Sequence, residues 1–243
     1  MKRSNQKNQY ALEFIKKLSD LSAADKDYLY DNCHVKIYKY NSLISFINDS
    51  NKYACYLASG FVADRYYNFK KEQDQYVEFY RQGEFFYPAT ELLDNIHGQE
   101  ELIAFSDRAI VIIIPYSILE RYKELSPLFD KTLQQQNNLK LTRARLFDVY
   151  CNVSSTKECI QNTLFYLAFL YGQTYGDYVR LPRRIDQNVL ASYTRSSISL
   201  VNSVINDYCK QGLAIRGRRK IMLKCSLVDE FIENTAFNML DKI

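Results

Sequence analysis

The 243-residue sequence has no tryptophan, two histidines and seven glycines, and its six cysteines include no C-x-x-C pair. Zinc ribbons and iron–sulfur clusters need closely spaced thiolates, so this spacing excludes them. Nucleophilic triads usually need a histidine, and neither His34 nor His97 has a recognisable serine or cysteine motif beside it. A glycine-rich phosphate loop is also missing. We therefore predict that the protein is not an enzyme and has no catalytic residue, metal or other cofactor.

The sequence also lacks a long apolar run. The longest, residues 109–115 (AIVIIIP), is far shorter than the roughly 20 residues of a membrane-spanning helix. Residues 1–10 carry positive charge but neither the apolar core nor the cleavage site of a signal peptide. We expect a cytoplasmic protein that does not contact a membrane.

The cysteines are spread along the chain, and most are expected to fill the core, because free cysteine is among the most buried residue types. The alternative is a redox-sensing thiol, for which Cys33, Cys151 and Cys159 are the candidates. The other three are Cys55, Cys209 and Cys225.

Charge is distributed unevenly. Residues 181–224 contain nine Lys or Arg and only two acids, a net charge of +7, while the rest of the chain sums to −3. A basic block at one end of an otherwise neutral chain is typical of a nucleic-acid-binding module. A merely solvated surface would interleave acidic residues.

The first half of the chain has the pattern of a helix-flanked β-roll. Residues 8–18 indicate a short amphipathic helix, and Ser22 to Asp25 form a capping box that begins a second helix. Short alternating or apolar runs then recur to about residue 115, separated by Asn, Asp, Ser and Gly turns. These runs predict an antiparallel β-roll or sandwich. They are residues 35–40, 53–57, 61–67, 76–80, 102–105 and 109–114.

A long helix is predicted from Leu128 to about Asn152. Its narrow stripe mixes apolar and polar residues, which suits a seam between two copies better than a domain core. We therefore predict a homodimer, with a β-roll domain over residues 1–127, a dimerisation helix over 128–150 and a DNA-binding domain over 151–243. The stripe consists of Leu128, Thr132, Gln135, Leu139, Thr142, Leu146 and Val149.

Residues 181–224 have the pattern of a winged helix-turn-helix. A short helix begins at Asp186 or Gln187, residues 193–196 form a turn, and a second helix runs from Ser197 to Gly212. Residues 213–216 and 220–223 then form a basic hairpin. In such modules the second helix enters the major groove of DNA. The competing interpretation is a small helical hairpin and strand hairpin without a ligand.

At these residues the sequence resembles the Crp/Fnr superfamily of transcription regulators. The matching features are the small Ala191 four residues before the turn, the helix over 197–208, Lys-Gln-Gly-Leu-Ala at 210–214, and Gly60 with residues 81–86 in the roll. The resemblance implies an α+β fold of N-terminal antiparallel β-roll, long dimerisation helix and C-terminal winged helix-turn-helix. It implies sequence-specific binding of double-stranded DNA by a homodimer, and RNA polymerase as a further partner.

The DNA module departs from the family pattern. Arg195 stands where the family has a turn glycine, which could cost about 1 kcal/mol if φ is positive. The family's recognition-helix Arg and Glu are replaced by Ile198, Ser199 and Ser203, so the usual half-site should not be bound. Arg195, Asn202 and Asn206 are the candidate base readers, and Gln187 is a candidate phosphate contact. The predicted DNA-binding residues are Gln187, Arg195, Ser196, Ser197, Ser199, Asn202, Ser203, Asn206, Arg216, Arg218, Arg219 and Lys220.

The sensor domain departs as well. Relatives that bind cAMP carry an arginine for its phosphate, but here no arginine follows Glu84 until Arg108. We expect no cAMP binding, because a buried phosphate would be unpaired. An aromatic or otherwise apolar effector is one alternative; a roll that serves only as a dimer scaffold or polymerase contact is another, and a carrier or enzyme with an incidental basic tail is the weakest. The candidate effector-pocket residues are Tyr66, Tyr80, Phe85, Phe86 and Tyr87.

Overall fold

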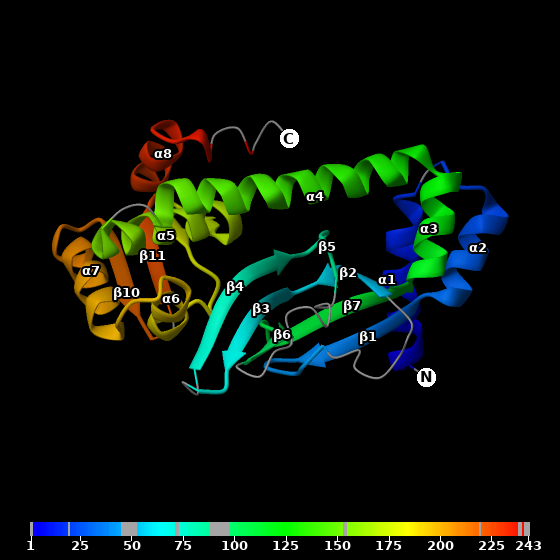
Figure 1. Ribbon diagram of the computed structural model, residues 1–243, viewed down its shortest axis with the longest axis horizontal. Coiled ribbons are helices and arrows are strands. Elements are labelled where there is room, and N and C mark those ends of the chain that lie inside the picture. The colour runs from blue at the N-terminus through cyan, green and yellow to red at the C-terminus, as the bar shows by residue number, and fades with distance from the viewer. Residues whose placement is uncertain are drawn as a thin grey trace. The chain divides into compact units, whose positions relative to one another are not determined.

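The computed structural model describes residues 2–18, 20–44, 53–70, 73–87, 98–152, 155–218, 220–237 and 240. The chain divides into two compact units, Met1–Gln136 and Asn137–Ile243. One long helix, α4 (Pro127–Phe147), begins in the first unit and ends in the second (Figure 1). Within the described residues, no helix combines the length and the apolar character needed to cross a membrane.

The first unit is the predicted antiparallel β-roll with helices against it (Figure 1). One sheet has the strand order β1-β7-β2-β5 and the other has β4-β3-β6. The elements are α1 (Lys2–Lys16), α2 (Ala23–Asn32), β1 (His34–Lys39), β2 (Tyr53–Ser59), β3 (Phe61–Asn68), β4 (Gln73–Arg81), β5 (Phe85–Phe86), β6 (Gly98–Ala104), β7 (Arg108–Pro115), α3 (Tyr116–Leu125) and the start of α4.

Strand β7 explains the longest apolar run of the sequence. Val111 and Ile113 point into the core between the two sheets. Ile112 and Ile114 point the other way, into a second core formed with α1, α3 and α4. A strand that is buried on both faces has no solvent-facing positions, so its sequence is continuously apolar rather than alternating.

Helix α4 is fixed to the turn between β4 and β5. The side chain of Gln136 accepts a hydrogen bond from the Phe85 backbone N–H (2.9 Å) and donates one to the Gly83 carbonyl (3.1 Å). The Phe85 ring also packs against Phe129 of α4, with ring centroids 5.8 Å apart. The turn of the roll and the helix are therefore in direct contact.

The second unit is the predicted winged helix-turn-helix with additional helices. Its four-stranded sheet has the order β10-β11-β9-β8; strand β8 was not predicted. The elements are the end of α4, the π-helical turn η2 (Asp148–Asn152), α5 (Thr156–Tyr171), β8 (Gln173–Tyr175), β9 (Tyr178–Arg180), α6 (Gln187–Tyr193), α7 (Ile198–Lys210), β10 (Ala214–Gly217), β11 (Lys220–Lys224) and α8 (Cys225–Glu233).

The helical stretch reaches Asn152, as the sequence predicted, but it changes type on the way. The α-helix α4 ends at Phe147, and the π-helical turn η2 continues it to Asn152. The side chain of Asn162, in α5, donates a hydrogen bond to the carbonyl of Tyr150 in η2 (2.7 Å), and Cys151 of η2 is fully buried. Packing onto α5 therefore replaces the regular helical pattern at this end.

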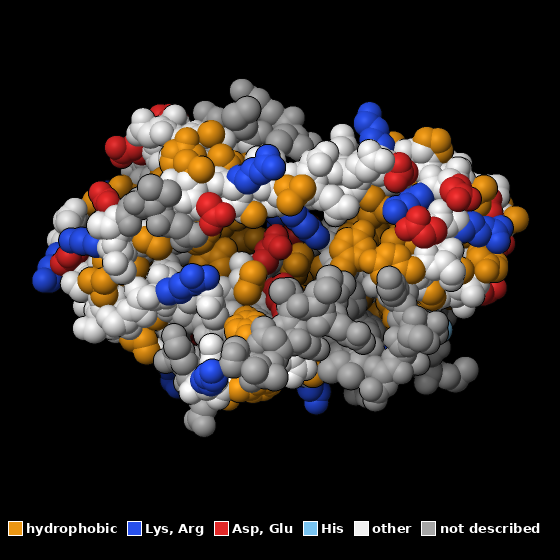
Figure 2. Space-filling model, viewed as in Figure 1, with side chains coloured by type: hydrophobic (Ala, Val, Ile, Leu, Met, Phe, Trp, Pro, Cys, Tyr) orange, Lys and Arg blue, Asp and Glu red, His pale blue; other side chains and the backbone are white. Residues whose placement is uncertain are grey.

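The predicted stripe of α4 lies apart from the face that packs in its own chain. Phe129 and Leu133 are buried, whereas Leu128 is 49% and Val149 58% exposed. The hydroxyl of Thr132 donates a hydrogen bond to the carbonyl four residues earlier in the same helix, as does that of Thr142, so these residues need no polar partner elsewhere. Apolar side chains are visible at intervals along the course of α4 in Figure 2.

Candidate nucleic-acid interface

Helix α6 begins where the sequence predicted, because Asp186 caps it. The Asp186 carboxylate accepts hydrogen bonds from the backbone N–H groups of Asn188 (2.9 Å) and Val189 (3.1 Å). These bonds satisfy donors that have no partner within the helix. Gln187, the candidate phosphate contact, is thereby placed at the first helical position, half-buried.

The turn between α6 and α7 is closed by short hydrogen bonds. The Thr194 hydroxyl donates to the Leu190 carbonyl (2.7 Å) and lies 2.7 Å from the Ser196 hydroxyl. The Ser196 backbone N–H donates to the Ala191 carbonyl (2.9 Å). Ser196, a predicted DNA contact, thus has its hydroxyl engaged within the turn. Arg195 has φ 52°, the left-handed conformation in which the family pattern has glycine.

We expect Arg195→Gly to raise the free energy of unfolding by up to about 1 kcal/mol, because glycine adopts positive φ without steric cost. Arg195→Ala removes the same side chain but keeps the Cβ atom, and should bring no gain. Urea denaturation of both variants measures the difference. Equal stabilities of the two variants would contradict strain at this position.

Helix α7 has one buried and one exposed face. Val201, Val204 and Ile205 are buried against the module. The N-cap Ser197, another predicted DNA contact, accepts a hydrogen bond from the Leu200 backbone N–H (3.2 Å), so its oxygen holds the helix start. The outward residues, all exposed, are Ile198, Ser199, Ser203 and Asn206.

Two candidate base readers differ from what the sequence indicated, one in its burial and the other in its hydrogen bonding. Asn202 is half-buried, and its Oδ1 is enclosed with no hydrogen-bond partner among the described residues. Asn206 accepts a hydrogen bond from the Arg216 guanidinium (3.2 Å), which ties α7 to the first wing strand. Sequence alone could not show the burial of Asn202 or the hydrogen bond of Asn206, because both depend on tertiary packing.

The wing is the predicted basic hairpin. Strands β10 and β11 pair in antiparallel register, with Arg216 opposite Ile221 and Gly217 opposite Lys220. Arg216 and Arg218 are exposed and Lys220 is half-buried; Arg219 lies outside the described residues. The hairpin lies beside α7 (Figure 1), and its exposed side chains include the cations of Arg216 and Arg218.

The start of α7 is favourable for an anion. Its first turn contains no acidic residue, and its basic residue, Lys210, lies in the last turn. The exposed N–H groups at a helix start carry partial positive charge, and no carboxylate cancels it here. The N-terminal end of α7 can thus approach phosphates closely.

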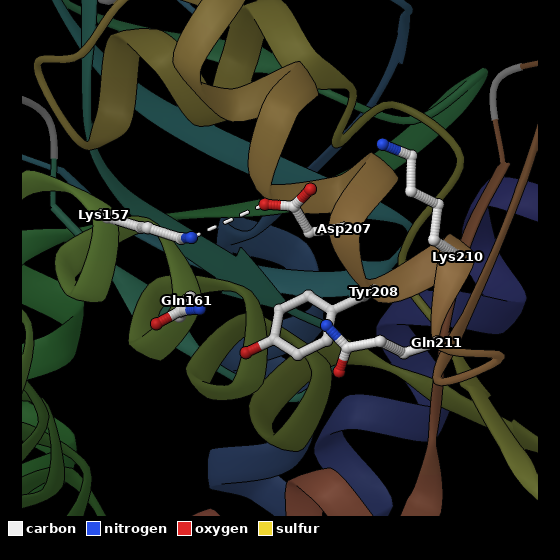
Figure 3. Close-up of a pocket in the computed structure, with 6 residues that line it drawn as sticks. All are labelled: Lys157, Gln161, Asp207, Tyr208, Lys210 and Gln211. Atoms are coloured by element: carbon white, nitrogen blue, oxygen red, sulfur yellow. Dashed lines mark hydrogen bonds and ion pairs between the residues drawn. The ribbon is translucent and has the colours of Figure 1, made fainter.

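A small polar hollow of about 220 Å³ lies at the opposite end of α7 (Figure 3). Lys157 and Gln161 of α5 face residues from the last turns of α7, and an ion pair joins Lys157 to Asp207 (3.5 Å). The hollow is remote from Ser197 along the helix, so it does not belong to the interface. Its other lining residues are Tyr208, Lys210 and Gln211.

The predicted effector-pocket residues do not share one face of the roll. Phe86 packs with Tyr80 in the core between the sheets (centroids 5.2 Å apart). Phe85 belongs to the core on the other side, with Phe129, and Tyr87 stacks on Tyr116 (6.0 Å). Since β5 alternates its side chains, neighbours in sequence point to opposite faces. Tyr66 lies on the same face of β3 as Val62, but Val62 is the residue opposite Tyr80 on β4, whereas Tyr66 is opposite Gln75.

A buried carboxylate in the roll was missed by the sequence analysis. Asp64 of β3 is 7% exposed, and its Oδ1 has no hydrogen-bond partner among the described residues. Burial, together with the nearby carboxylates of Glu100 and Glu78, raises its pKa to about 8. The signal was available in the alternation of β3, which points Val62, Asp64 and Tyr66 to the same side.

The candidate redox thiols lie in the interior. Cys33 and Cys151 are buried, and burial raises the pKa of each thiol to about 12. Burial also raises the pKa of Cys159. A reactive cysteine needs an accessible thiolate, so these environments argue against a redox sensor at these three positions.

Comparison with known proteins identifies the fold. No family model and no curated protein sequence matches the chain. Among solved structures, a cyclic nucleotide-binding domain containing protein from Listeria monocytogenes matches with a TM-score of 0.71 and 17% identity, over 88% of this chain and 97% of that one.

Two further structures extend over similar lengths. A CooA variant from Carboxydothermus hydrogenoformans has a TM-score of 0.66 and 14% identity, over 84% of this chain and 88% of that one. The c-di-GMP responsive global regulator CLP from Xanthomonas campestris has a TM-score of 0.63 and 16% identity, over 84% and 99%. The chain therefore has the Crp/Fnr-type fold.

Proposed function

We propose that the protein is a homodimeric, sequence-specific DNA-binding transcription regulator of the Crp/Fnr type that acts in the cytoplasm. The observation that carries this proposal is the winged helix-turn-helix over residues 181–224, with nine Lys or Arg and two acids. Basic groups on such a module neutralise phosphates and release counterions, which supplies the sequence-independent part of the affinity.

The proposed binding mode places the start of α7 in the major groove and the wing along the phosphate backbone. Arg216, Arg218, Arg219 and Lys220 contact phosphates or the minor groove, and Gln187 contacts a phosphate beside α6. Arg195, Ser199, Asn202 and Ser203 set the sequence preference. Ser196, Ser197 and Asn206 act mainly by holding the turn and the wing, since each already has a partner within the module.

Arg218→Ala and Ser203→Ala should weaken DNA binding in different ways. Arg218→Ala should lower affinity for specific and scrambled duplexes alike and reduce the salt slope by about two units, because each protomer of the dimer loses one phosphate contact. Ser203→Ala should lower affinity for the specific duplex alone, by about 1 kcal/mol for each half-site, the usual worth of one hydrogen bond.

Fluorescence anisotropy at two salt concentrations, with a site selected from a random pool and its scrambled version, distinguishes the two effects. If Ser203→Ala weakened both duplexes equally, the assignment of α7 as the recognition helix would be wrong. Far-UV circular dichroism of both variants controls for folding.

The homodimer is proposed to form along the exposed stripe of α4. Leu128, at the start of α4, and Val149, in the adjoining turn η2, are exposed at the two ends of the stripe, and the half-buried Leu139 and Leu146 lie between them. An uncovered apolar stripe on a long helix is the surface that a two-stranded seam buries.

The roll is proposed to sense an effector other than cAMP, through the turn that Gln136 joins to α4. Of the predicted pocket residues, Tyr80 and Phe86 pack together in the core between the two sheets, which supports them as the part of the roll nearest to such an effector. An effector-independent regulator is the alternative, with the roll as a scaffold or a contact for RNA polymerase. Native mass spectrometry of the protein distinguishes the two alternatives. A co-purified small molecule supports the effector-sensing roll, whereas a protein that carries no small molecule and still binds DNA with full affinity supports the effector-independent regulator.

A further inference from the structure

The first turn of α7 presents an isoleucine to solvent. Ile198 is 46% exposed and occupies the first helical position, directly after the N-cap Ser197. Single exposed apolar residues are common on protein surfaces and need no explanation by themselves. This one lies on the outward face of the helix that the DNA-binding proposal places in the major groove, within the basic part of the chain.

The neighbours of Ile198 leave few ways to read a base. Ser199 and Ser203 share the exposed face, and neither they nor Ile198 can form the bidentate bonds by which arginine recognises guanine. The charged residues of α7, Asp207 and Lys210, lie near its other end. Apart from the half-buried Asn202 and from Asn206, which is bonded to Arg216, the outward face of the helix therefore offers short hydroxyls and one branched apolar side chain.

The major groove contains one apolar group that such a side chain can recognise. Thymine carries a C5-methyl at the groove edge, whereas the other recognition points are hydrogen-bond donors and acceptors. The isoleucine side chain has no polar atom. If it covered a base donor or acceptor, that group would lose its hydration without gaining a hydrogen bond, so contact with a methyl group is the favourable pairing.

The local structure holds Ile198 in place for such a contact. Its backbone follows a capped helix start, fixed by the bond between Ser197 and the Leu200 N–H. Because isoleucine is branched at Cβ, its χ1 is strongly restricted in a helix. Little side-chain freedom is then lost when it meets a base.

We propose that Ile198 determines specificity by contacting the C5-methyl of one thymine in each half-site, an inference that rests on the proposed DNA-binding function. The protein thus selects a half-site with thymine opposite the start of α7. The contact supplies discrimination where the helix has no charged reader.

Replacement of thymine by deoxyuridine removes only the methyl group and tests the proposal directly. A duplex site is selected from a random pool with the full-length wild type, and each thymine is then replaced in both half-sites symmetrically. At one position the affinity should fall about fourfold for each methyl lost, and about fifteenfold for the pair, if each buried methyl is worth about 0.8 kcal/mol.

The same substitution in Ile198→Ala should change affinity less than about twofold, because the partner of the methyl is gone. Ile215→Ala serves as the matched control, since Ile215 is a similarly exposed isoleucine (43%) in wing strand β10. In that variant the full loss on deoxyuridine substitution should remain.

Three results overturn the inference: no thymine is sensitive to loss of its methyl, Ile198→Ala retains the wild-type sensitivity, or the selected half-site contains no thymine. In each case the wild type still binds its selected site, so the DNA-binding function survives. Failure of the wild type to select any duplex would instead overturn the function and the inference together.

Discussion

Leu139→Asp is expected to make the protein monomeric at micromolar concentration and to lower its affinity for a two-fold-related duplex at least a hundredfold. Leu139 lies at the centre of the α4 stripe, where an aspartate would bury a charge against its copy in the partner. A dimer binds its second half-site as an intramolecular event, which contributes on the order of 10²–10⁴ in affinity and is lost in a monomer.

Leu141→Asp is the matched control for this variant. Leu141 is 60% exposed on the same helix but lies outside the stripe, so its substitution should leave both the dimer and the DNA affinity unchanged. Sedimentation equilibrium reports the oligomeric state of the wild type and both variants. A monomeric wild type, or a Leu139→Asp protein that stays dimeric, would refute the α4 seam.

Asp64→Asn is expected to stabilise the protein by several kcal/mol at pH 8 and to change little near pH 4. The pKa of Asp64 rises from its ordinary 3.8 to about 8 in the folded protein, first through burial and then through Glu100 and Glu78. Between these values the folded state holds a proton that the unfolded state has released. The free energy of unfolding of the wild type is therefore undiminished by Asp64 below about pH 4, and it falls by about 1.4 kcal/mol per pH unit as the pH rises towards 8.

Urea denaturation of the wild type and Asp64→Asn at pH 4.5, 6 and 8 measures this difference, in which titrating groups that do not interact with Asp64 cancel. Asp74→Asn is the control: Asp74 is a partly exposed carboxylate paired with Arg65 (3.0 Å), so its loss should cost little and should not reverse with pH. A difference between wild type and Asp64→Asn that stays constant across the three pH values would show that Asp64 titrates normally.

The helix-turn-helix could be predicted in detail because its boundaries are set locally. Asp186 and Ser197 cap the two helices, and Gly212, with φ 70°, follows the second. The positive φ of Arg195 was anticipated only through the family resemblance, since no property of arginine indicates it.

Features that depend on packing were not predictable. The sequence pattern over the π-helical turn η2 is typical of a continuous α-helix. The hydrogen bond from Asn162 to the Tyr150 carbonyl joins η2 to α5, and a contact between two elements has no local sequence signal. The two-residue strand β5 is too short for alternation to show that Phe85 and Phe86 point into different cores. The enclosure of the Asn202 amide likewise arises from tertiary contacts.

Wild-type anisotropy titrations across a salt series test whether this Crp/Fnr-type fold binds DNA through its winged helix-turn-helix, as we claim. If all four wing cations of each protomer neutralise phosphates, a dimer makes eight such contacts, and log K should fall linearly with log salt with a slope of about −7. The selected site should be two-fold related, with half-sites about one helical turn apart. Binding with no salt dependence, or no binding to any duplex at low salt, would contradict the claim.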